Sequence, residues 1–174
     1  MTDTARIREI CERNVRILTL KPDKGHLTCA TRARVEDGLR CSIEEGSWTL
    51  SADMPGKAGG DESAPTPGML GRGALASCLA MGIVMWAARM NIPVDAVDVE
   101  IEADFDARGE LGMDEAPVGY SELRRSISIQ SSADEAALLE LVDTAERYSP
   151  YLNVFASAQS MQRSLRLNGK EAES

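Results

Sequence analysis

The feature that most constrains this chain is a long apolar segment near its centre, between Thr66 and Met90. Thr66 followed by Pro67 is typical of a helix start, because threonine caps the first turn and proline suits the first helical position. The pattern predicts a helix to about Met90, roughly 36 Å long at 1.5 Å per residue. Residues 74–88 are apolar around most of its circumference, and a helix without a polar face must be covered on all sides. Since one small domain rarely surrounds such a helix, we expect an obligate homodimer.

The same segment bears on cellular location. Its uninterrupted apolar part, residues 73–88 between Arg72 and Arg89, has sixteen residues, fewer than the roughly 20 that span a bilayer. Residues 1–16 are charged throughout and lack the apolar core of a secretory signal. We therefore expect a buried helix, no membrane association and a cytoplasmic location.

The segments on either side of this helix alternate apolar and polar residues, the period of a β-strand. From His26 the alternation predicts a strand to about Val35, followed by a hairpin turn at Asp37-Gly38. A return strand and a third strand at 48–52, with Trp48, Leu50 and Ala52 facing inward, complete a three-stranded meander. Residues 97–106 are apolar at every odd position and acidic at every even one, and 120–130 is the predicted partner strand. Arg124 and Arg125 are expected to offset the acidic row across that pair.

Helices and a last strand complete the predicted α+β order, α-β-β-β-α-β-β-α-α-β. A short amphipathic helix is predicted at 4–15, and a helix with a capping box at 132–135 is predicted to stop at Pro150. A second short helix at 151–160 and a strand at 161–167 follow. The predicted organisation is an N-terminal helix and linker at 1–25, one domain at 26–167 and a polar tail at 168–174.

Charge and composition exclude several classes of function. The net charge of −9 repels phosphate backbones, so nucleic-acid binding is not expected. His26 is the single histidine, and no two of the four cysteines are closer than twelve residues, so we expect neither a metal site nor a cofactor. Without an export signal the thiols are expected to be reduced. The cysteines are Cys11, Cys29, Cys41 and Cys78.

Cys78, in the middle of the central helix, is the candidate for chemistry. It is either a small apolar core residue or a reactive thiol, and the second role requires a nearby cation or hydrogen-bond donors. The sequence around it, GGDESAPTPGMLGRGALASCLAM at 59–81, resembles the OsmC/Ohr family. The shared motif is a Gly-rich loop, a Thr-Pro helix start and Ala-Leu-Ala-x-Cys.

The resemblance implies an intertwined homodimer with a β(3)-α-β(2)-α(2)-β subunit, to which the N-terminal helix is an addition. It also implies reduction of organic hydroperoxides by a reactive cysteine, with Cys78 at the peroxidatic position. The thiolate attacks a peroxide oxygen, an alcohol leaves and the cysteine becomes a sulfenic acid. The partners implied are an alkyl or fatty-acid hydroperoxide and an external thiol reductant.

The chain departs from the family pattern at three places. The resolving cysteine before a proline is Ser149 here, which cannot form a disulfide, and the glutamate after the helix-start proline is Gly68. Glu62 is the nearby substitute for that carboxylate, unless it is a solvated loop charge. The family's arginine near the first hairpin has a candidate in Arg34, with Arg32 and Arg40 close by, unless each is an exposed strand residue.

Three hypotheses follow from these departures. The first is a one-cysteine thiol peroxidase that depends on Cys78 and is reduced by an external thiol. The second is a non-catalytic dimer of the same fold that binds a small apolar ligand or a protein partner. The third is a structural role in a larger assembly, for which the sequence offers no specific feature.

Overall fold

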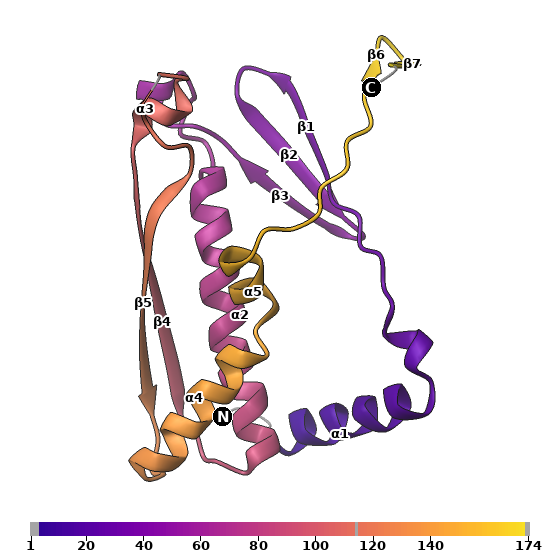
Figure 1. Cartoon of the computed structure of the whole chain (residues 1–174), viewed down its shortest axis with the longest axis vertical. Coiled ribbons are helices and arrows are strands. Elements are labelled where there is room, and N and C mark those ends of the chain that lie inside the picture. The colour runs from indigo at the N-terminus through magenta and orange to yellow at the C-terminus, as the bar shows by residue number, and fades with distance from the viewer. Residues whose placement is uncertain (1–3, 114, 173–174) are drawn as a thin grey trace.

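The computed structural model describes residues 4–113 and 115–172 (Figure 1). A first helix precedes a three-stranded meander, and the long central helix is followed by a strand pair, two helices and a small C-terminal hairpin. Their bounds are α1 Thr4–Leu20, η1 Pro22–Gly25, β1 Arg32–Asp37, β2 Arg40–Glu45, β3 Trp48–Ala52, η2 Gly56–Ala58, α2 Pro67–Met90, β4 Ala96–Phe105, α3 Ala107–Glu110, β5 Tyr120–Gln130, α4 Glu135–Arg147, α5 Pro150–Ala156, β6 Arg166–Leu167 and β7 Lys170–Glu171.

The central helix α2 begins and ends where the sequence predicts. The Thr66 hydroxyl accepts a hydrogen bond from the Met69 N–H at 3.2 Å, and Asn91 ends the helix in the left-handed region, at φ 60°. One face of α2 is buried against β4, α4 and α5. The spacing of four residues along this face places successive side chains one turn apart: the buried residues are Leu75, Leu79, Ile83 and Ala87.

The strand pair β4–β5 covers one side of α2, as Figure 1 shows. Its antiparallel register runs from Ala96 opposite Gln130 to Phe105 opposite Tyr120. From Val97 to Ala103 the apolar residues of β4 are half-buried, and its acidic residues are exposed, so the predicted half-buried strand is confirmed.

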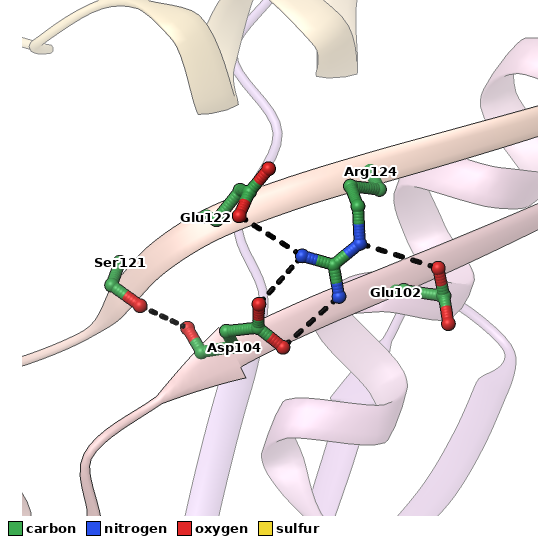
Figure 2. A network of polar contacts seen from close by, with 5 residues as sticks. All are labelled: Glu102, Asp104, Ser121, Glu122 and Arg124. Atoms are coloured by element: carbon green, nitrogen blue, oxygen red, sulfur yellow. Dashed lines mark hydrogen bonds and ion pairs between the residues drawn. The ribbon is translucent and has the colours of Figure 1, made fainter.

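Arg124 offsets the acidic row, as expected. Figure 2 shows its guanidinium between Glu102, Asp104 and Glu122, and the hydrogen bond from Arg124 lowers the pKa of Asp104. The expectation was wrong for Arg125, which binds both carboxylate oxygens of Glu146 at 2.6 and 3.0 Å. Alternation explains this, because neighbouring residues on a strand point to opposite faces. Arg125 therefore joins β5 to the last turn of α4.

Several predicted bounds were wrong, including that of the second short helix, since α5 ends at Ala156 and not at residue 160. Helix α1 continues to Leu20 instead of ending near residue 15, and α4 is capped by Asp134, whose carboxylate accepts from the Ala137 N–H at 2.9 Å. Strand β1 starts at Arg32, not at His26, because Arg32 pairs with Glu44, β2 ends at Glu45 and residues 26–30 have no strand opposite them. The predicted last strand at 161–167 is reduced to β6, which pairs with β7 at 170–171 inside the predicted tail. The rest of that tail, 173–174, lies outside the described residues.

The N-terminal third of the subunit is ordered without being buried. None of residues 4–51 is buried, and Trp48 and Leu50 are exposed in the single chain although the alternation predicts that they face inward. The chain exposes 13650 Å², whereas a compact monomer of 18.8 kDa exposes about 8,300 Å². Within the described residues, the single subunit therefore leaves apolar surface that a compact monomer would cover.

Helix α2 is long and apolar enough to cross a bilayer by length and composition. The sequence predicts a segment too short to span a bilayer, because the apolar run between Arg72 and Arg89 has only sixteen residues. The helix extends beyond that apolar run at both ends. Only 17% of its most apolar window is buried in the subunit. A mostly buried core helix passes the same test. Within the described residues of the single chain, nothing covers the exposed side of α2.

A buried carboxylate fixes the loop that leads into α2. Asp53 is 2% exposed, and its oxygens accept hydrogen bonds from the N–H groups of Met54 at 2.8 Å and Ser63 at 3.0 Å and from the Ser63 hydroxyl at 2.7 Å. Gly60 completes this turn, because a Cβ there would lie 2.0 Å from the Met54 carbonyl oxygen. The loop is thus an ordered lead-in to the central helix.

We predict that this loop makes stability depend on acid pH. The Ser63 hydrogen bonds lower the pKa of Asp53 from 3.8 to about 2. The folded state therefore favours the carboxylate, and its contribution is full above the unfolded pKa and lost as pH falls through the folded one. Urea unfolding at pH 6 and pH 3 should show a steeper loss of stability in the wild type than in Asp53→Asn. Equal slopes would contradict the assignment.

Candidate functional site

The structure brings Cys78 and Ser149 together, 71 positions apart in the sequence. The Cys78 Sγ lies 3.6 Å from the Ser149 Oγ. Cys78 is half-buried on α2, and Ser149 is 6% exposed where α4 ends and α5 begins. The resemblance predicts this juxtaposition, because Ser149 occupies the resolving position.

Ser149 has a second role as the cap of α5. Its Oγ accepts a hydrogen bond from the Leu152 N–H at 3.2 Å, and its own N–H donates to the Glu146 carbonyl at 3.1 Å. Because Oγ accepts from Leu152, its hydroxyl proton is available to Cys78. Glu146 is held in turn by Arg125, so the β5–α4 ion pair fixes the turn that carries Ser149.

An apolar pocket lies next to this pair. Its volume is about 160 Å³. It is lined by Leu75, which lies one turn before Cys78 on α2, and by Leu152, whose N–H binds the Ser149 Oγ. Arg124 and Arg125 also line it. The other lining residues are Ile101, Leu123, Phe155 and Ala156. A pocket of this character suits an alkyl group better than a sugar or a nucleotide.

The other two predicted site residues are engaged elsewhere in the single chain. Arg34 forms an ion pair with Glu36 at 2.6 Å, and both side chains are mostly exposed. Glu62 accepts a hydrogen bond from the Gly56 N–H at 2.9 Å and has φ 55°, so it organises the loop. Neither contacts Cys78, whose polar contact among the described residues is Ser149. Their roles in chemistry stay predictions.

The four cysteines, Cys11, Cys29, Cys41 and Cys78, are free thiols. Cys29 is exposed and precedes β1, although the alternation from His26 predicts that it lies within the first strand. Within residues 4–113 and 115–172, the structure has no group of three or more histidine, cysteine, aspartate or glutamate side chains that could hold a metal ion.

Sequence reasoning missed two residues that meet at the start of α2: Arg72 of α2 and Tyr120, the first residue of β5. The Arg72 Nη1 donates a hydrogen bond to the Tyr120 hydroxyl at 3.1 Å, and that hydroxyl donates to the Gly68 carbonyl at 3.4 Å. A Cβ on Gly68 would lie 3.3 Å from Arg72 Nη1 and 3.5 Å from the Tyr120 oxygen. The carboxylate position of the family pattern is therefore next to a guanidinium. The spacing of Gly68 and Arg72, one helical turn, is the signal that could have found this pair.

We predict that Gly68→Glu stabilises the protein. Glycine costs helix stability, and a carboxylate in the first turn interacts favourably with the helix dipole and with Arg72. The far end of the flexible Arg72 side chain can move by the few tenths of an ångström required. Urea unfolding should show an increase of about 1 kcal/mol. Gly68→Gln, the uncharged control, should give a smaller increase, and a Glu variant less stable than Gln would contradict the expected attraction.

Comparisons with known proteins agree with the fold. The OsmC-like protein family model matches residues 59–162. The OsmC-like protein of Mycoplasma pneumoniae superposes with a TM-score of 0.63 at 14% identity, over 75% of this chain and 88% of that one. The organic hydroperoxide resistance protein OsmC of Legionella pneumophila gives 0.54 at 21% identity, over 74% and 89%.

A third solved structure is similar to the same extent. The organic hydroperoxide resistance protein of Elizabethkingia anophelis superposes with a TM-score of 0.54 at 17% identity, over 74% of this chain and 88% of that one. None of the curated proteins matches the chain. At these identities the solved structures show the α+β fold, while the family model covers more than half of the sequence. The chain belongs to the OsmC-like protein family.

Proposed function

We propose that this protein is a homodimeric, thiol-dependent reductase of organic hydroperoxides in which Cys78 is the nucleophile. The observation that carries the proposal is the 3.6 Å approach of Cys78 Sγ and Ser149 Oγ, within a family whose similar structures are named hydroperoxide resistance proteins. The Ser149 hydroxyl is within reach to donate a hydrogen bond to the sulfur that attacks the peroxide.

In the proposed reaction the Cys78 thiolate attacks the outer oxygen of a hydroperoxide, ROOH. The S–O bond forms as the O–O bond breaks, the alkoxide takes a proton and leaves as ROH, and Cys78 becomes a sulfenic acid. Ser149 has no thiol to resolve it. One external thiol therefore displaces water and forms a mixed disulfide with Cys78, and a second releases Cys78 as a thiol and leaves with the first as a disulfide. Such a cycle suits a reducing compartment, and we place the protein in the cytoplasm.

The pocket beside Cys78 supports an apolar organic group as the part of the substrate that binds. Leu75 lies one turn before Cys78 on α2, and the Leu152 N–H binds the Ser149 Oγ, so an alkyl chain in the pocket is close to the residues that hold the reacting pair. A volume of about 160 Å³ fits a short chain or the end of a longer one. Arg34 and Glu62 are proposed in secondary roles, as candidates for orienting the peroxide.

The exposed side of α2 supports a homodimer. Exposed residues recur every four positions along it, at Met69, Gly73, Ser77, Met81 and Met85. This row is apolar or small and lies opposite the buried row. The excess surface of about 5,000 Å² over a compact monomer exceeds the roughly 1,000–2,500 Å² per chain that an obligate dimer covers. An interface of that class fits on this side.

The test is hydroperoxide consumption by the purified full chain with dithiothreitol as reductant, using tert-butyl and linoleic hydroperoxide. We expect catalytic consumption by the wild type and by the control variant Cys41→Ser. This control makes the same substitution at another half-buried thiol, which lies outside the proposed site. Cys78→Ser should fall to the rate of the reductant alone. Equal rates for wild type and Cys78→Ser would overturn the proposal.

The pocket also favours a second candidate, a non-catalytic dimer that binds a small apolar ligand. In this role the protein binds an alkyl ligand without consuming it, and Cys78→Ser binds the ligand as the wild type does. Retained binding of an alkyl alcohol together with no turnover in the wild type would favour this role over the first.

A further inference from the structure

Helix α1, which the family pattern does not include, carries an apolar face that the single subunit does not cover. Ile7, Ile10, Cys11, Ile17 and Leu18 repeat at three-, four- and seven-residue spacing, which places them on one side of the helix. None of the residues of α1 is buried, and every residue from 12 to 20 is exposed. Half of an amphipathic helix therefore extends into solvent.

Helix α1 is held to α2 near its start, and at its end it contacts the η1 segment that follows it, where a Cβ on Gly25 would lie 3.7 Å from the Leu18 side chain. The Arg8 side chain donates to the Ala88 carbonyl and to the Asn91 side-chain oxygen, each at 2.6 Å, and so holds α1 against the C-terminal end of α2. Beyond Cys11 the helix leaves the body of the subunit. Short helices are marginal in water unless packing supports them, so the second half of α1 needs a surface to pack against.

The charge of α1 points to the nature of that surface. The helix has four arginines and two glutamates, a net charge of +2, in a chain of net charge −9. The remainder of the chain is therefore at −11. A basic helix with an exposed apolar face is complementary to a partner of net negative charge, and a second copy of this chain, with its net charge of −9, is such a partner.

The position of α1 agrees with this occupant. In Figure 1 α1 and the β1–β3 meander extend from opposite ends of α2 toward the same side, away from the β4–β5 pair. A second copy seated on that side of α2 lies within reach of α1. We propose that α1 is a clasp that packs its apolar face on the second copy of this chain and so contributes to the dimer; this inference rests on the homodimer proposed above.

The test compares two substitutions in adjacent positions of the full-length chain by sedimentation equilibrium. Leu18→Glu places a carboxylate on the apolar face. Thr19→Glu introduces the same residue and charge change on the polar side, which Thr19 shares with Glu12 and Arg16. We expect Leu18→Glu to raise the dimer dissociation constant at least tenfold and Thr19→Glu to change it less than twofold. Leu18→Ser, which adds no charge, should also raise the dimer dissociation constant, by a smaller factor.

Different outcomes separate the clasp from the dimer. A wild-type chain that sediments as a monomer at micromolar concentration overturns the dimer and the clasp with it. A dimer with the same dissociation constant in wild type, Leu18→Glu and Leu18→Ser overturns the clasp alone. Binding of the wild type to vesicles containing anionic phospholipid, lost in Leu18→Glu while the dissociation constant is unchanged, overturns the clasp in favour of a membrane surface.

Discussion

Met81→Glu should convert the proposed dimer into a monomer at micromolar concentration. Met81 is 60% exposed in the single chain and lies in the middle of the exposed row of α2. In a twofold dimer through this row the substitution buries two carboxylates without partners, and an uncompensated buried charge costs about 3–5 kcal/mol. Since about 1.4 kcal/mol is a factor of ten, the dissociation constant should rise at least 100-fold, as measured by sedimentation equilibrium.

Leu139→Glu is the matched control. Leu139 is also 60% exposed, but it lies on α4, on the side of α2 that its own subunit already covers. Both variants place a glutamate at a position whose side chain is exposed to the same extent, but Leu139 lies outside the proposed interface, so Leu139→Glu should remain a dimer. A Met81→Glu protein that stays dimeric would show that the two copies do not meet through this row of α2.

Ser149→Cys should form a disulfide with Cys78 on mild oxidation. The present Sγ–Oγ distance of 3.6 Å requires a small shift to reach the roughly 2.05 Å of a sulfur–sulfur bond. Closing a loop of 71 residues restricts the unfolded chain by about 4 kcal/mol. Loss of the Oγ cap of α5 offsets about 1 kcal/mol of that gain. The oxidised variant should therefore unfold at a clearly higher urea concentration than its reduced form, with the bond identified by peptide mass spectrometry.

Two companion variants isolate the cause. Ser149→Ala removes the cap without adding a thiol and should lose about 1 kcal/mol. The double variant with Cys78→Ser should form no disulfide and gain no stability on oxidation. If residues 78 and 149 of Ser149→Cys both remain free thiols after oxidation, the side chains at these two positions are not as close as described here. If the bond forms and turnover with a dithiol rises, the resolving thiol was the limiting part.

The sequence by itself determined the elements whose causes are local. Thr66-Pro67 and the apolar run fixed α2 from Pro67 to Met90, because a cap and a helix period act within a few residues of each other. The strict alternation in β4 fixed its buried and exposed faces for the same reason. The resemblance of residues 59–81 to the family predicted the place of Cys78, and Ser149 followed from its proline.

Only the tertiary structure decided what depends on residues far apart. The alternation from His26 has the period of a strand, yet β1 starts at Arg32 because a strand requires a partner opposite it and β2 ends at Glu45. Arg125 binds Glu146, and Arg72 meets the Tyr120 hydroxyl, because apolar side chains of β5 pack against α2 and α4. Asp53 is buried because the loop folds back over it through Ser63. No local period encodes these contacts, since each joins segments that the chain brings together only when its apolar faces pack.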